Sequence, residues 1–178
     1  EILSKELERI NKVIPHVHLQ QLLSRSETEQ MIEDYDFVVI AAGAKQPRTL
    51  PIPGSERMVT ALDFLQASKA GSAQVGAKVV IIGAGNVGCD VATEAARLGA
   101  KDITLLDVQQ PASFGKERED AEQVGAKFRW PVFTKAITDE GVQLDTGEVI
   151  AADSVFISIG DIPDLEFLTD DIATDRGF

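Results

Sequence analysis

The chain has 178 residues, 44% of them hydrophobic, and a formal net charge of −12 at pH 7. This length allows one well-packed core or slightly more than one domain, and no apolar run approaches the roughly 18 residues that a membrane span requires. The acidic balance excludes nucleic acid as a partner and disfavours anionic membranes, because like charges repel.

The first 59 residues combine helical, extended and proline-rich patterns. Apolar residues at three- and four-residue steps predict an amphipathic helix that ends at Pro15. A capping-box pattern of Ser26 and Glu29 predicts the start of a second helix. That helix should reach about residue 33, and we further expect a short strand over residues 17–22, a buried parallel strand over residues 37–41 and a stiff, extended loop through Pro47, Pro51, Pro53 and Gly54.

From Thr60 onward, helical and extended patterns alternate along the chain. Thr60 and Asp63 indicate the start of a helix that runs to about Ala70. Further helices are expected over residues 87–98 and 116–124, and strands over residues 78–82, 103–106, 128–133, 136–138, 142–144, 148–150 and 154–159. This order predicts a Rossmann-like α/β fold: a parallel sheet with helices on both sides and a small antiparallel β-meander over about residues 128–150.

A glycine fingerprint of the form G-x-G-x-x-G follows the predicted strand at residues 78–82. Gly83 would allow a tight turn, Gly85 would leave room for a pyrophosphate, and Gly88 would let the helix pack closely on the strand. The free N–H groups and partial positive charge of the helix N-terminus would attract the phosphates. A glycine-rich turn that serves packing alone is the alternative, but the strand–turn–helix–strand context favours a dinucleotide site. The candidate cofactor-binding residues are therefore Gly83, Ala84, Gly85, Asn86, Val87 and Gly88.

Asp107 ends the second strand of this unit, 24 residues after Gly83. An acid about 20 residues beyond the fingerprint binds the ribose hydroxyls in dinucleotide-binding units. Its charge would repel a 2′-phosphate, so we expect NAD(H) to be preferred over NADP(H). Lys116 and Arg118 follow within reach and could weaken that preference. An exposed acid that merely ends a strand is the alternative.

The remaining reactive side chains form no catalytic or metal-binding pattern. Cys89 is the only cysteine, which rules out an internal disulfide and fits the reducing cytoplasm. We expect it to be a packing residue, because no second cysteine or neighbouring histidine accompanies it. His16 and His18 have no further ligands near them in sequence. We therefore expect no catalytic side chain and no metal, which suits hydride transfer between two cofactors that carry the chemistry themselves.

Four segments together resemble one family, the FAD-dependent pyridine nucleotide-disulfide oxidoreductases of the glutamate synthase small-subunit type. The resemblance lies in the fingerprint region at residues 83–100, in residues 35–44, in the crossing at residues 50–54, and in the return strand at residues 157–164. It implies that NAD(P)H passes hydride to FAD, and that electrons continue to another acceptor such as an iron–sulfur domain or subunit. Gly160 would approach the nicotinamide half.

The resemblance also implies a division of the chain into three parts. Residues 1–59 would be a partial FAD-domain segment and crossover, residues 60–164 the NAD(P)-binding domain, and residues 165–178 the start of the return to the FAD domain. Family members that use NADPH commonly have Tyr-Arg-Arg after the second strand, where this chain has Asp107, Val108 and Gln109. This departure points to NADH, and Val108 joins Asp107 as a candidate cofactor-binding residue.

A second departure from the family is the number of fingerprints. Members hold the FAD pyrophosphate on another G-x-G-x-x-G, and this sequence has only one. The chain is therefore expected to be a piece that binds NADH without completing turnover, the missing FAD domain being part of the same protein. The alternative is an NAD-binding regulatory or sensing module without hydride chemistry, against which the family-like residues 35–54 argue.

Overall fold

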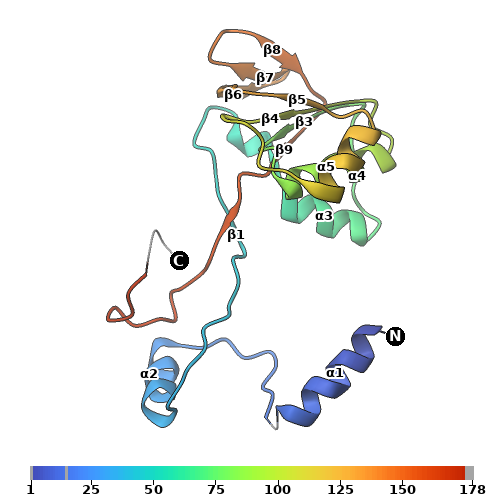
Figure 1. Ribbon diagram of the computed structural model, residues 1–178. Coiled ribbons are helices and arrows are strands. Elements are labelled where there is room, and N and C mark those ends of the chain that lie inside the picture. Colours follow the sequence, from blue (N-terminus) through green and yellow to red (C-terminus); the bar gives the residue numbers. More distant parts are fainter. Residues whose placement is uncertain (1, 15, 175–178) are drawn as a thin grey trace. The chain divides into compact units, whose positions relative to one another are not determined.

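The computed structural model describes residues 2–14 and 16–174, and the chain divides into two compact units (Figure 1). One unit comprises residues 44–163, and the other combines the residues up to Gly43 with those from Asp164 onward. No helix among the described residues is long and apolar enough to cross a membrane.

A five-stranded parallel sheet forms the centre of the unit of residues 44–163. Its strand order is β2-β9-β3-β4-β5, with all four neighbouring pairs parallel. The strands are β2 (Val59–Thr60), β3 (Lys78–Ile82), β4 (Asp102–Leu106), β5 (Lys127–Arg129) and β9 (Ser154–Ile157). After its first residue each of β3 and β4 is buried, and the buried residues are apolar except Thr104. This suits their positions, because strands of a parallel sheet are buried on both faces.

Three helices connect and cover this sheet. They are α3 (Ala61–Lys69), α4 (Asn86–Arg97) and α5 (Gly115–Gln123). Thr60 caps α3 as predicted, because its side chain accepts a hydrogen bond from the Asp63 nitrogen at 3.1 Å. The β3–α4–β4 unit predicted from the glycine fingerprint is confirmed, with Val79 paired to Ile103 and Ile82 to Leu106.

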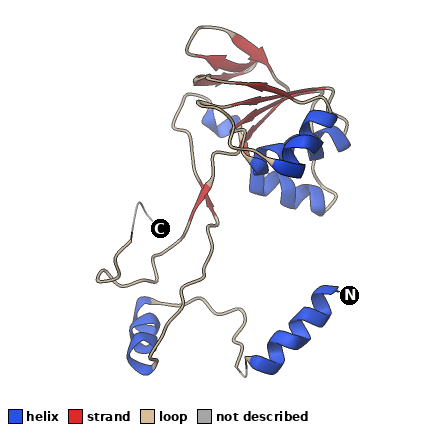
Figure 2. Cartoon of the chain, viewed as in Figure 1, coloured by secondary structure: helices blue, strands red, loops and turns tan. Residues whose placement is uncertain are grey.

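The two faces of the sheet have different covers, which corrects the expectation of helices on both sides (Figure 2). All three helices pack on one face, where Ile81 and Leu105 contact buried α4 residues such as Val91. The antiparallel meander covers the other face and packs against Val80 and Leu106. Its strands are β6 (Thr134–Thr138), β7 (Gly141–Leu144) and β8 (Val149–Ala151).

The meander begins later than predicted, since β5 pairs in parallel with β4 and belongs to the main sheet. Residues 130–133, which were expected to be strand, are not part of one, and β9 ends at Ile157, two residues before the expected end. A further small ladder was not predicted: β1 (Gln46–Pro47) pairs antiparallel with β10 (Asp161–Ile162) inside the proline-rich segment. A short 3-10 helix, Ser55–Arg57, follows β1.

The other unit contains α1 (Ile2–Val13) and α2 (Arg25–Asp34). Both helices were predicted, although Pro15, the expected end of the first, lies outside the described residues. The capping box of α2 consists of Ser24 and Glu27, two residues before the predicted pair, with the Ser24 nitrogen 2.7 Å from the Glu27 carboxylate. The Arg25 guanidinium at the start of α2 donates a hydrogen bond to the Asp170 carboxylate at 3.0 Å, which connects the residues after Asp164 to this helix.

Two predicted strands of this unit are absent. Residues 17–22 and 37–41 have no strand structure, and Phe37 and Val39 are 90% and 86% exposed. The apolar run at residues 37–41 suits a buried strand, but none of the described strands pairs with it, and a strand exists only through its neighbours. The predicted return segment at residues 165–178 is described only to residue 174.

Candidate functional site

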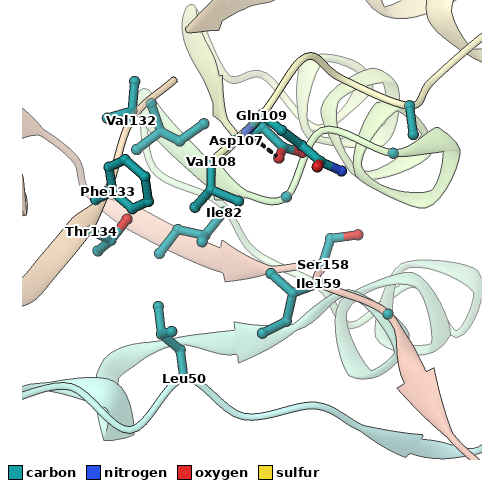
Figure 3. A pocket seen from close by; sticks show the side chains of 15 residues that line it. Leu50, Ile82, Asp107, Val108, Gln109, Val132, Phe133, Thr134, Ser158 and Ile159 are labelled. Carbon is teal, nitrogen blue, oxygen red and sulfur yellow. Dashed lines mark hydrogen bonds between the residues drawn. The ribbon is translucent and has the colours of Figure 1, made fainter. Parts of the chain in front are cut away.

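The site lies where β3, β4 and β9 end side by side. Gly83 follows β3, Asp107 follows β4, and Ser158 follows β9. A pocket of about 460 Å³ opens at this edge (Figure 3). Open α/β sheets bind ligands outside the carboxyl ends of their strands, so the pocket has the location expected for a ligand site. Its lining includes Leu50, Ile82, Gly83, Gly85, Leu106, Asp107, Val108, Gln109, Ala112, Val132, Phe133, Thr134, Ser158, Ile159 and Gly160.

Each of the three fingerprint positions is a glycine for a different structural reason. Gly83 has φ +105°, and a Cβ there would lie 2.1 Å from the Ser158 carbonyl oxygen. A Cβ on Gly88 would lie 2.3 Å from the Gly83 oxygen, so helix and turn are in backbone contact. Gly85 has ordinary backbone angles, and a Cβ there would meet no atom within 4 Å. The protein itself therefore requires Gly83 and Gly88, whereas Gly85 leaves space toward the solvent.

Helix α4 begins directly after Gly85, and no side chain caps it. The first N–H groups of a helix have no partner within the helix. The start of this helix, including Val87, therefore presents backbone N–H groups that can bind an anion. The Ala84 nitrogen, which precedes the helix, is not available, because it donates to Asp107.

Asp107 is half-buried and held by backbone on both sides. One carboxylate oxygen accepts from the Ala84 nitrogen at 3.0 Å, and the other accepts from the Gln109 nitrogen at 3.2 Å. The Asp107 main chain is fixed as well, because its nitrogen donates to the Arg129 oxygen at 3.1 Å. An ionised carboxylate has about four lone-pair directions, so Asp107 keeps acceptor capacity for hydroxyl groups of a ligand.

The two cations that could reach the pocket have partners elsewhere. Lys116 forms an ion pair with Asp120 on α5. Arg118 pairs with Glu122 at 2.6 Å, and its guanidinium lies 3.5 Å from the centre of the Phe128 ring. None of the described residues that line the pocket is a lysine or an arginine. The carboxylate of Asp107 therefore makes its end of the pocket negatively charged.

Apolar side chains form one wall of the pocket and a second hollow adjoins it. Val108 is 56% exposed and shares the lining with Val132 and Phe133. The second pocket, of about 420 Å³, meets the first at Gly85, Ser158 and Gly160. Its lining includes Pro47, Arg48, Leu62, Asn86, Val87, Asp90 and Asp161. The two hollows thus flank the glycine turn and can accept the two halves of an elongated ligand.

The structure brings the predicted residues together but gives the Asn86 side chain two partners that sequence reasoning missed. Its side chain accepts a hydrogen bond from the Phe114 nitrogen at 2.9 Å and donates to Glu117 at 3.4 Å. These partners are 28 and 31 positions away in sequence, so no local pattern could have indicated them.

The titratable groups near the turn show no nucleophile. Burial raises the pKa of the Cys89 thiol, so the protonated form prevails at neutral pH. Burial also raises the pKa of Asp90, and the charges of Glu117 and Asp120 add to this effect. Within residues 2–14 and 16–174, no cluster of three His, Cys, Asp or Glu side chains could hold a metal ion.

Comparison with known proteins agrees with this geometry. Residues 4–178 match the family described as pyridine nucleotide-disulphide oxidoreductase. The NADPH-Fe(3+) oxidoreductase subunit beta of Geobacter sulfurreducens is 27% identical over 83% of this chain and 27% of its own length. A putative glutamate synthase [NADPH] small chain of Cereibacter sphaeroides is 34% identical over 54% of this chain and 27% of its own length.

Among solved structures, a 2-naphthoyl-CoA reductase complex superimposes with a TM-score of 0.61 and 25% identity. The match covers 81% of this chain and 23% of the reductase. The chain therefore spans about a quarter of the length of these relatives.

Proposed function

This chain belongs to the pyridine nucleotide-disulphide oxidoreductase family, and we propose that its residues 44–163 bind NADH for a flavin-dependent oxidoreductase. The pyrophosphate would lie at the N-terminus of α4 beside Gly85, where a Cβ would meet no atom within 4 Å. Asp107 would accept the hydroxyls of the adenosine ribose. Gly160, which lines both pockets, would face the nicotinamide half.

The preference for NADH over NADPH is carried by one observation, the fixed carboxylate of Asp107. It stands in a pocket whose described lining contains no lysine or arginine. A 2′-phosphate placed there would meet a negative charge without a compensating cation. Both curated relatives described above have NADPH in their names, so the proposal separates this chain from them on the basis of Asp107.

In the proposed reaction, the role of this chain is to bind the cofactor and to orient it. NADH held at this site would supply a hydride to the flavin of the full-length protein. Val108, Val132 and Phe133 would bury the adenine against an apolar wall. The glycine turn would fix the phosphates, so that the nicotinamide reaches the second pocket in one orientation. No side chain is assigned a proton-transfer role.

The remaining residues are proposed to belong to the flavin-binding part of the protein. We propose that residues 1–59 contain a partial FAD-domain segment and the crossover, and that residues from 165 onward return to that domain. Residues 44–59 belong to the same compact unit as the glycine turn, which supports a crossover that packs with the dinucleotide-binding residues. A glutamate synthase small-subunit type of protein, with an iron–sulfur domain or subunit as the next acceptor and a cytoplasmic location, fits this proposal.

Stopped-flow reduction of the flavin in the full-length protein by NADH and by NADPH tests the function. Faster reduction by NADH is expected. Faster reduction by NADPH would overturn the cofactor assignment. Binding of NADH with no flavin reduction would instead support a regulatory or sensing module.

A further inference from the structure

The N-terminus of α5 is capped by the side chain of Asn86, the first residue of α4. Phe114 precedes the helix, has no side-chain cap of its own, and leaves its backbone N–H in need of an acceptor. Glu117 is the third residue of α5, the position from which a glutamate often accepts the preceding N–H in a capping box. Here the Asn86 amide lies between them: Oδ1 accepts from the Phe114 nitrogen at 2.9 Å, and Nδ2 donates to Glu117 at 3.4 Å.

This bridge fixes the far end of the loop at residues 108–114. The near end is fixed by Asp107, whose carboxylate bonds to the Ala84 nitrogen at 3.0 Å. The partners of the two anchors, Ala84 and Asn86, lie in the glycine turn and at the first residue of α4. The loop between the anchors has no helix or strand structure. Val108, Gln109 and Ala112 of this loop line the first pocket.

We infer that Asn86 is a positioning residue that holds this loop against the adenosine half of NADH. The inference rests on the proposed NADH site. In it, the Asn86 side chain binds the loop, and only the backbone of residue 86 contacts the cofactor. Without the bridge, the loop would keep its anchors at Asp107 and at Ser113, whose hydroxyl accepts from Arg118 at 3.3 Å. Its pocket-lining residues would then be held less firmly. Loosening should then weaken contacts to the adenosine and leave those to the nicotinamide half unchanged.

An amide is the side chain that this position requires. The Phe114 N–H can only donate and an ionised Glu117 can only accept, so the bridge needs one acceptor and one donor on the same group. An aspartate at position 86 would keep the acceptor but would place a second carboxylate against Glu117. Changing Glu117 to glutamine would supply the missing donor and remove the repulsion.

The test is titration of the full-length protein with NADH and with reduced nicotinamide mononucleotide, which lacks the adenosine half. The variants are Asn86→Ala, Asn86→Asp, and Asn86→Asp combined with Glu117→Gln. Glu119→Gln, which changes an exposed glutamate on α5, is the control for the loss of one negative charge at Glu117. Melting temperatures report on folding.

Asn86→Ala and Asn86→Asp should each weaken NADH binding about tenfold, the size expected when partly buried hydrogen bonds are lost. Binding of the mononucleotide should stay at the wild-type value in Asn86→Ala, which adds no charge beside the proposed phosphate position. The double variant should recover NADH binding to within about threefold of wild type, since its side chains restore the complementary bonds. If Asn86→Ala does not fold, the two isosteric variants still give this comparison.

Three results would overturn the inference: wild-type NADH affinity in Asn86→Ala, equal weakening of both ligands, or a double variant no better than Asn86→Asp. The second result would place the Asn86 side chain at the shared nicotinamide or phosphate half. Failure of the wild-type protein to bind NADH is a different outcome, which would reject the proposed function itself.

Discussion

The carboxylate of Asp107 accepts a hydrogen bond from the backbone nitrogen of Ala84 at 3.0 Å. This contact joins the residue after β4 to the middle of the turn after β3. The proposed ribose-binding group and phosphate-binding turn are thus one connected structure. A change at Asp107 should affect both the charge of the pocket and the turn.

Asp107→Asn should reduce the preference for NADH. The amide keeps an oxygen for the Ala84 nitrogen but loses the charge that strengthens bonds to ribose hydroxyls and repels a 2′-phosphate. NADH affinity should fall about tenfold, while NADPH affinity stays the same or rises. Fluorescence titration with both nucleotides measures the ratio. Asp145→Asn, an exposed aspartate in the meander, is the control for net charge, and an unchanged ratio in Asp107→Asn would contradict the assignment.

Gly88→Ala and Gly85→Ala should separate folding from binding. A Cβ at residue 88 would lie 2.3 Å from the Gly83 oxygen, so the helix must shift. The free energy of unfolding in urea should fall by about 1–3 kcal/mol, as in other overpacked sites. At residue 85 a Cβ meets no atom within 4 Å and φ is −77°, so stability should be retained while NADH binding is lost. Equal destabilisation by both would refute this distinction.

Acid should weaken the contact between α3 and α4. Hydrogen bonds from Arg97 and from Ser68 lower the pKa of Glu94 from 4.5 to about 2. A carboxyl with a lowered folded-state pKa stabilises the fold above its unfolded-state pKa, and this contribution is lost as the pH falls through the folded-state value. The stability advantage of wild type over Glu94→Gln should therefore shrink as the pH falls from 4.5 to about 2.

Urea unfolding at several pH values across this window measures the effect on Glu94. Glu140→Gln changes an exposed glutamate in the β6–β7 turn and provides the matched control. A constant difference between wild type and Glu94→Gln across the window would show that the ion pair with Arg97 does not contribute to the pH dependence.

Residues 44–163 should fold when produced alone. Both apolar clusters lie entirely within this range, and so do all the described strand pairs. In the other unit, the described residues that are buried are only Thr28 and Leu168. We expect one cooperative urea transition for residues 44–163, monitored by circular dichroism, and none for residues 1–43. A gradual, non-cooperative loss of signal from residues 44–163 would contradict the expectation.

Local patterns predicted much of the fold. The Thr60 cap, the strand at residues 78–82 and the helix after Gly85 depend on signals within a few residues, and the structure has all three. Local signals did not predict which elements pack on each face of the sheet. The apolar residues 79–82 of β3 show that both faces are buried, but they do not reveal whether a helix or a meander covers each face.

Long-range contacts account for the other differences. Residues 37–41 have the same apolar character as β3, yet a strand needs a neighbour, and that is not a property of the segment. At the site, the fingerprint spacing located Asp107 at the end of β4. The partners of Asn86 depend on how the loop at residues 108–114 folds back, which the spacing does not determine.

The glycine turn also decides how β3 sits in the sheet. A slip by one residue exchanges the two faces of a strand, and polarity would oppose this only weakly here, because residues 79–82 are all apolar. Gly83 does oppose it: its φ of +105° and its contact with the Ser158 oxygen exclude any residue with a side chain. A slipped β3 would bring Ile82 or Ala84 to that place. The residue proposed to shape the cofactor turn therefore also specifies the strand register, so its replacement should cause misfolding as well as loss of binding.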